Sequence, residues 1–80
     1  MDVKLVAFGI AKEILSSSTL SFPLEGDQSI GTLKQALVAQ YPEFEKLTSL
    51  RFAVNEDYQD DSYSIQAGDE VVIIPPVSGG

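Results

Sequence analysis

Hydrophobic and polar positions alternate near the start of the chain, as they do along a β-strand. Residues 3–8 therefore predict the first strand. One set of alternate positions is wholly apolar and predicts a face that packs on a core: Val3, Leu5 and Ala7. The other set is only partly polar: Lys4, Val6 and Phe8. The second face of this strand thus carries apolar side chains in addition to the core-facing set.

Residues 19–24 alternate polar and apolar side chains without a break, which predicts a second strand with one buried face. Pro23 has no backbone N–H to donate, so this strand belongs at an edge of the sheet. Between the two strands, isoleucines four positions apart predict a short helix over residues 10–15, which ends at the three serines that follow it.

A longer helical pattern follows. Ser29 is a residue type that caps helix N-termini and Pro42 stops a helix, so the principal helix is predicted from Ile30 to about Gln40. Its apolar stripe has the spacing of one helix face: Ile30, Leu33, Leu37 and Tyr41. Two further apolar residues are expected to close the core after the helix: Phe44 and Leu47.

The second half of the chain predicts three more extended segments. Residues 50–54 form a strand whose inward side chains are expected to be Leu50, Phe52 and Val54. A turn over residues 55–57 leads to a brief strand that begins at Tyr58. Gly68 is expected at positive φ in the next turn. Residues 71–74 are apolar at both parities, so this last strand belongs in the middle of the sheet.

Together these elements predict an α+β fold in a single domain at residues 1–74, with one sheet and the principal helix across one face of it. Neither an internal repeat nor a second domain is apparent in the sequence. Because the last strand is central, residues 75–80 are expected to leave from the middle of the sheet as an extended tail.

Composition narrows the chemistry. The 80 residues include no cysteine and no histidine, which excludes disulfides, thiol nucleophiles and histidine-dependent catalysis. The net charge of −7 has the wrong sign for binding a phosphate backbone, so no nucleic-acid partner is expected. The acidic excess fits either solubility alone or a basic protein partner. With neither a long apolar span nor a leader pattern, the protein is expected to be cytoplasmic and away from membranes.

Neighbouring carboxylates occur at four places: Glu43/Glu45, Glu56/Asp57, Asp60/Asp61 and Asp69/Glu70. Their spacing lacks the interior glycine and the terminal glutamate of a calcium loop, so we interpret them as solvated turns and expect no metal site. Ser78 has no neighbouring base to activate it. The chain is therefore not expected to be an enzyme by itself.

The last six residues cannot belong to a core: Pro75, Pro76, Val77, Ser78, Gly79 and Gly80. Proline fixes φ and lacks the N–H, and glycine has no side chain to bury. Extended, the segment spans about 19 to 20 Å, enough to enter a cleft of a partner. A terminus without function is the alternative. The α-carboxylate of Gly80 is the reactive group that remains, and it becomes an acyl donor once a separate enzyme adenylates it.

Strand parity places apolar residues on the sheet face away from the principal helix: Val6, Phe8, Val72 and Ile74, with Tyr58 at the rim. Such a cluster is either ordinary scattered surface or a protein interface. We interpret it as a docking face. Exposure of Phe8 and Ile74 is the observation on which this interpretation depends.

A resemblance to known proteins rests on three segments: Ala53-Val54-Asn55, Gly68-Asp69-Glu70-Val71 and Pro75-Pro76-Val77-Ser78-Gly79-Gly80. They resemble the MoaD-type ubiquitin-like sulfur carriers, the small subunits of molybdopterin synthase. Further matches extend over nearly the whole chain: Phe8, Ala11-Lys12-Glu13-Ile14, Ser29-Ile30, Leu33 and Leu37. The resemblance implies a β-grasp (ubiquitin-like) fold with mixed sheet order 2-1-5-3-4, its last strand parallel to the first, and a flexible C-terminal tail.

The resemblance also implies a chemistry. Gly80 is adenylated by an ATP-dependent enzyme similar to MoeB and converted to a thiocarboxylate. The tail then enters a large synthase subunit similar to MoaE, within a heterotetramer, and donates sulfur to precursor Z to make the molybdopterin dithiolene. The carrier itself binds no cofactor, and the catalytic groups belong to its partners. The family's docking contacts fall at Phe8, Tyr58 and Ile74, although some members carry leucine at position 58 and phenylalanine at position 74.

Three alternatives stay open. A ThiS-type carrier for thiamine thiazole synthesis also ends in Gly-Gly on a β-grasp fold, but the segment 75–78 and the chain length favour the molybdopterin branch. A ubiquitin-like modifier conjugated to lysines of target proteins is the second alternative, and the sequence allows both roles in one protein. A β-grasp binding module with an inert tail is the third.

Overall fold

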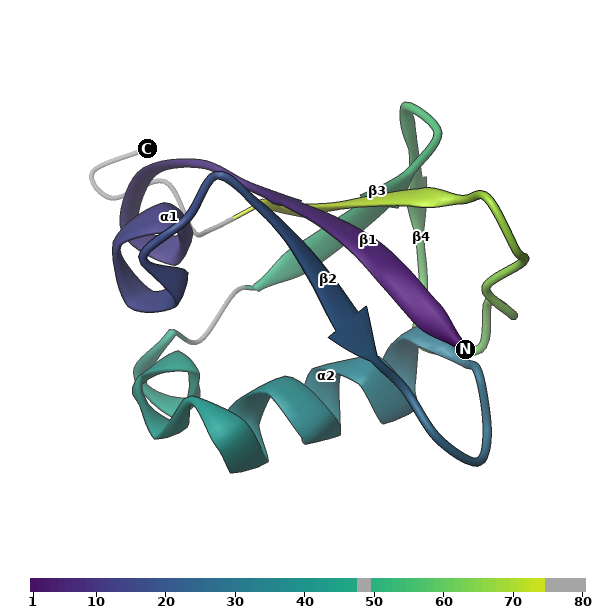
Figure 1. Cartoon of the computed structure of the whole chain (residues 1–80), viewed down its shortest axis with the longest axis horizontal. Coiled ribbons are helices and arrows are strands. Elements are labelled where there is room, and N and C mark those ends of the chain that lie inside the picture. The colour runs from purple at the N-terminus through teal and green to yellow at the C-terminus, as the bar shows by residue number, and fades with distance from the viewer. Residues whose placement is uncertain (48–49, 75–80) are drawn as a thin grey trace.

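The computed structural model describes residues 1–47 and 50–74. Its elements follow one another in this order: β1 Asp2–Ala7, α1 Gly9–Leu15, β2 Thr19–Pro23, α2 Ile30–Gln40, the 3₁₀ helix η1 Pro42–Lys46, β3 Arg51–Val54, β4 Asp57–Gln59 and β5 Glu70–Ile74. Figure 1 shows two layers: the sheet forms one layer, and α2 runs along the other. The predicted tail, residues 75–80, lies outside the described residues.

The sheet has the order β2-β1-β5-β3-β4. The strands β1 and β5 pair in parallel, and the other neighbouring pairs are antiparallel. This confirms the order 2-1-5-3-4 and the central position of the last strand. Pro23 lies on the edge strand β2, as its missing N–H requires.

The principal helix begins and ends as predicted, at Ile30 and Gln40. Ser29 is its N-cap, and its hydroxyl oxygen accepts a hydrogen bond of 3.1 Å from the backbone N–H of Thr32. Three residues of the predicted stripe are buried and face the sheet: Ile30, Leu33 and Leu37. The fourth, Tyr41, is half-buried and packs against the core.

The first strand ends at Ala7, one residue earlier than predicted. Phe8 is the N-cap of α1, and its carbonyl oxygen accepts hydrogen bonds from the N–H groups of Ala11 and Lys12 at 3.1 and 3.4 Å. Gly9 then takes a positive φ of 56° and starts the helix. Phe8 is therefore the cap of a helix and not a residue of the strand. The alternation of side chains does not reveal this boundary.

The core lies between the sheet and the helices. Its buried side chains come from every strand except β4, from both α-helices and from η1. Leu50, Phe52 and Val54 all face inward, as predicted, and Phe44 closes the core from η1. Gly68 has the predicted positive φ, at 89°. Within the described residues, none of the helices has the length and hydropathy needed to cross a membrane.

Candidate docking site

One row of side chains crosses the sheet on the face opposite α2. The strand register pairs Val6 with Val72, Val72 with Ala53, and Ala53 with Tyr58. All four are therefore on the same face of four adjacent strands. Thr19 of β2 continues the row beyond Val6.

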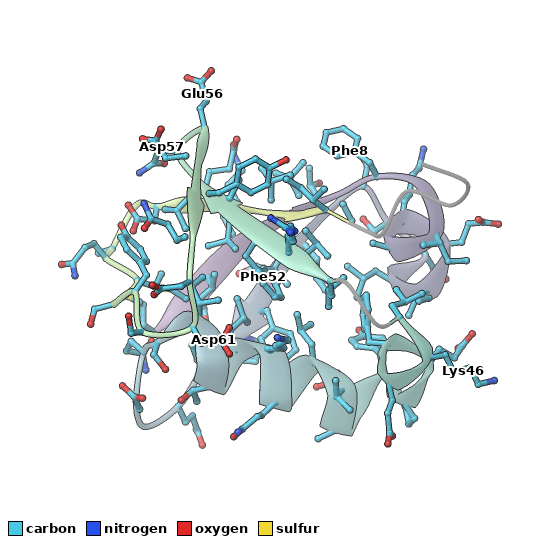
Figure 2. The ribbon with its side chains drawn as sticks, turned by 180° about the vertical axis from the view of Figure 1, so that it is seen from behind. Phe8, Lys46, Phe52, Glu56, Asp57 and Asp61 are labelled. Atoms are coloured by element: carbon cyan, nitrogen blue, oxygen red, sulfur yellow. The ribbon has the colours of Figure 1, made fainter. Side chains whose placement is uncertain are left out.

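A second, parallel row on the same face lies two residues further along the chain from Val6 and Val72. Ala7 pairs with Ile73, so Phe8 and Ile74 follow at the same end of adjacent strands. Figure 2 shows Phe8 on the side of the sheet opposite α2. We call the six residues of the two rows the outer apolar patch: Val6, Phe8, Ala53, Tyr58, Val72 and Ile74.

Exposure differs across the outer apolar patch. Phe8 is 58% exposed and Tyr58 is 65% exposed, values that are high for large apolar side chains. The residues on the central strands are half-buried: Val6, Val72 and Ile74. Ala53 is only 7% exposed, because it sits between the Val72 and Tyr58 positions. The patch thus has two projecting aromatic side chains around a lower aliphatic centre.

Sequence reasoning predicted five of the six patch residues and missed Ala53. The signal was present, since position 53 alternates with the inward-facing Phe52 and Val54. The structure brings Phe8 and Ile74 to one end of the sheet, with Phe8 largely exposed and Ile74 half-buried. A docking role for the patch stays a prediction.

Charged residues border the patch. Lys4 and Glu70 are two residues before Val6 and Val72 in the register, on the same face of the sheet, and their side chains form an ion pair of 3.3 Å. Arg51 pairs in register with Ile74 and is exposed. Glu56 and Asp57 project at the tip of the β3–β4 hairpin (Figure 2). The apolar centre is therefore flanked by charges of both signs.

The β3–β4 hairpin has a two-residue turn with positive φ at both central positions, 49° at Asn55 and 76° at Glu56. This is the backbone pattern of a type I′ turn, in which asparagine is favoured. The Asn55 side chain also binds the loop before β5, since its Nδ2 donates to Asp69 Oδ1 at 2.9 Å and its Oδ1 accepts from the Glu70 N–H at 3.2 Å. The turn that presents Tyr58 is thus anchored to β5.

Asp69 is the centre of this anchor. Its Oδ2 accepts a hydrogen bond of 2.8 Å from the Gln66 N–H and one of 3.0 Å from the Tyr63 hydroxyl. The Gln66 N–H is the main cause that lowers the pKa of Asp69, and the bonds from Asn55 and Tyr63 add to it. The same bond to Asp69 raises the pKa of Tyr63. Sequence reasoning missed this network.

The prediction that the acidic pairs are solvated turns holds for Asp60 and Asp61, which are exposed in the loop after β4. It is wrong for Glu43 and Glu45, which lie in η1, and for Asp69, which is half-buried. Asp60 Oδ1 accepts from the backbone N–H and the hydroxyl of Ser62, which lowers the pKa of Asp60. Asp61 forms a wide ion pair of 3.8 Å with Lys34. Over residues 1–47 and 50–74, no group of three or more acidic side chains is arranged to hold a metal ion.

The reactive group predicted from the sequence, Gly80, lies outside the described residues, as do the five tail residues before it: Pro75, Pro76, Val77, Ser78 and Gly79. Ile74 is the last described residue of β5, and it belongs to the outer apolar patch.

Comparison with known proteins gives consistent matches. The model of the ThiS family matches residues 6–80. The molybdopterin synthase sulfur carrier subunit of Arabidopsis thaliana is 32% identical over 81 residues, which cover 100% of this chain and 84% of that protein.

Solved structures match over the whole chain as well. SAMP1 from Haloferax volcanii superposes with a TM-score of 0.80 at 26% sequence identity, covering 100% of both chains. In a complex of subunits 1 and 2 of molybdopterin-converting factor from Helicobacter pylori, the matching chain has a TM-score of 0.65 at 22% identity, with 100% of both chains covered. These likenesses confirm the β-grasp fold.

Proposed function

The chain belongs to the ThiS family, and we propose that within it the protein is a sulfur carrier, the small subunit of a molybdopterin synthase. The observation that carries the proposal is the full-length similarity to a named sulfur carrier subunit, which extends through the Gly-Gly end of the chain. The fold supports it, because β5 is the central strand and ends directly before the six tail residues. Residues 1–74 form the domain in this proposal, and residues 75–80 form the tail.

The proposed chemistry takes place at the Gly80 carboxylate. An oxygen of this carboxylate attacks the α-phosphate of ATP on a MoeB-like enzyme, and pyrophosphate leaves. Sulfide then attacks the carbonyl carbon of the acyl-adenylate, AMP leaves, and Gly80 carries a thiocarboxylate. The chain has no cysteine or histidine to perform these steps, so its partners supply the catalytic groups.

In the synthase, the thiocarboxylate donates its sulfur to precursor Z while the tail occupies a MoaE-like large subunit in a heterotetramer. The tail holds the sulfur at the reacting position, so the carrier contributes proximity. The outer apolar patch docks on the large subunit. The Helicobacter pylori complex supports a partnership of this kind, because a chain that matches this one occurs there in a complex of subunits 1 and 2.

Intact mass measures the proposed function directly. The protein is incubated with the MoeB-like enzyme, ATP and a sulfur donor, and the expected mass change is the replacement of one terminal oxygen by sulfur. Deletion of Gly80 is the matched control and abolishes the change. A wild-type chain that stays unmodified, under conditions in which a known carrier is charged, would contradict the proposal. Conversion of precursor Z by the charged carrier with the large subunit then separates the pterin pathway from thiazole synthesis.

Docking through the outer apolar patch predicts that Phe8→Asp weakens binding to the large subunit by at least about tenfold, since it places an unpaired charge in a desolvated contact. The fold should persist, because the Phe8 side chain is 58% exposed. Calorimetric titration measures the affinity, and Ile10→Asp is the control because Ile10 is also an exposed apolar residue, at 42%, outside the patch. Equal affinities of Phe8→Asp and the wild type would remove Phe8 from the interface.

A protein modifier is the second candidate function. SAMP1, the 26% identical protein that matches over the whole chain, carries the name of a small archaeal modifier protein. The acyl-adenylate of Gly80 would then pass to a lysine amine and form an amide. Conjugates of the tagged chain on lysines of other proteins, absent when Gly80 is deleted, support this function.

A further inference from the structure

Arg51 stands out among the cations of the outer sheet face. It shares this face with Ala53 and pairs in register with Ile74, so it lies directly beside the outer apolar patch. Its nearest counterpart on the face, Lys4, is bound to Glu70 at 3.3 Å. Within residues 1–47 and 50–74, Arg51 forms no ion pair and its guanidinium donates no hydrogen bond.

A hollow of about 420 Å³ opens beside Arg51 at the β3–β4 edge, with room for a side chain of a partner. Its other lining residues are Leu50, Phe52, Tyr58, Gln59, Asp60 and Asp61. Both acids in this lining already have partners within the chain, Ser62 for Asp60 and Lys34 for Asp61. Among the described residues, Arg51 is the charged residue of the hollow whose side chain has no ion-pair or hydrogen-bond partner.

Docking changes the surroundings of Arg51. When a partner covers Ile74 and fills the hollow, it also removes water from Arg51, which pairs in register with Ile74 and lines the hollow. A guanidinium that loses water without gaining an acceptor is strongly unfavourable, whereas one that meets a carboxylate forms two parallel N–H···O bonds. The five N–H donors of arginine fit this planar acceptor better than a lysine ammonium does.

We propose that Arg51 is a specificity-determining residue of the docking face, and that the large synthase subunit presents a carboxylate to it. This inference rests on the proposed function and adds the chemistry of the contact. The partner surface then combines an apolar centre, one carboxylate at the Arg51 position and an overall basic character that suits the −7 charge of this chain.

Charge reversal at Arg51 tests whether the partner presents a negative group at this position. Arg51→Glu and Lys46→Glu change the net charge equally, but Lys46 lies in η1 at the helical layer, away from the outer face (Figure 2). The two variants therefore share any long-range effect on a basic partner. Arg51→Glu should bind the large subunit at least about tenfold more weakly than Lys46→Glu, because it sets two carboxylates against each other. Arg51→Lys should fall between the wild type and Arg51→Glu.

The partner carboxylate is identified by rescue. Exposed aspartates and glutamates of the large subunit are changed to lysine one at a time, and one such change should restore the binding of Arg51→Glu while weakening that of the wild type. Equal thermal unfolding of the variants shows that the fold is intact, as expected for an exposed side chain at the start of β3.

Two results would overturn the inference: an affinity of Arg51→Glu equal to or tighter than that of Lys46→Glu, or a failure of every partner substitution to restore binding. The first would mean that Arg51 stays in water or faces a basic surface. Failure of the proposed function appears in a separate measurement, the absence of thiocarboxylate on the wild-type chain, so the two failures are distinguishable.

Discussion

At the scale of single residues, Asp69 holds together the part of the molecule that presents Tyr58. Its carboxylate accepts hydrogen bonds from Asn55, Tyr63 and Gln66 at 2.9, 3.0 and 2.8 Å. These hydrogen bonds stabilise the ionised carboxylate in the folded protein. The pKa of Asp69 is therefore lowered from its ordinary value, mainly by the Gln66 N–H. The residue links the β3–β4 turn, the loop after β4 and the start of β5.

Asp69→Asn should lower the free energy of unfolding by about 1–2 kcal/mol at neutral pH, because hydrogen bonds to an ionised acceptor are replaced by weaker ones and one amide donor faces other donors. Urea denaturation measures the difference. The folded pKa of Asp69 lies below its ordinary value of 3.8, so the stabilisation is fully present above that value and is lost as the pH falls through the lower folded pKa. The gap between wild type and variant should therefore close in acid.

Asp57→Asn is the matched control, since Asp57 is an exposed carboxylate at the tip of the same hairpin. Its effect should stay within about 0.5 kcal/mol, as for surface substitutions outside hydrogen-bond networks. A gap for Asp69→Asn that is independent of pH, or one no larger than that of Asp57→Asn, would show that the carboxylate does not anchor the turn.

Residues of this kind also mark a limit of sequence reasoning. The capping by Ser29, the edge position of Pro23 and the positive φ of Gly68 follow from the chemistry of each residue and its near neighbours. The contact of Asn55 with Asp69 joins residues 14 apart, and it exists only after β3 and β5 have paired. No local pattern encodes it.

At the scale of elements, burial explains which predictions were confirmed. The strand β5 is apolar at both parities because Val71 and Ile73 face the core while Val72 and Ile74 belong to the outer apolar patch. Its central position followed from that pattern alone, whereas its parallel pairing with β1 came from the family resemblance. The sequence predicted the end of α2 before Pro42 but not the helix η1. The reason is that Pro42 stops one helix and also suits the first turn of the next.

Phe8 shows how an element boundary changes the meaning of a residue. As a strand residue it would alternate strictly with Ala7, but as the N-cap of α1 it lies where the chain turns away from the sheet. Its ring consequently projects beyond the sheet face and is 58% exposed. The alternation predicted the correct face of the sheet for Phe8 but placed the end of the strand one residue too late. The reason is that a strand residue and a helix N-cap both have an extended backbone.

At the scale of the whole molecule, the candidate site was largely predictable. Five of its six apolar residues follow from strand parity, and the sixth, Ala53, follows from the same rule. The position of Arg51 beside Ile74 did not follow, because it requires the register between β3 and β5. The net charge of −7 over 80 residues, in contrast, is known from the sequence alone.

This charge predicts how fast the carrier meets its partner. If the large subunit is basic around the docking contact, the association rate should fall by about tenfold or more between roughly 20 mM and 500 mM salt, because screening shortens the reach of the acidic field. The dissociation rate should change far less, since it reports the apolar contact. Stopped-flow mixing with the large subunit measures both. Lys46→Glu should associate faster than the wild type at low salt and equally fast at high salt, and an association rate independent of salt would leave solubility as the role of the acidic excess.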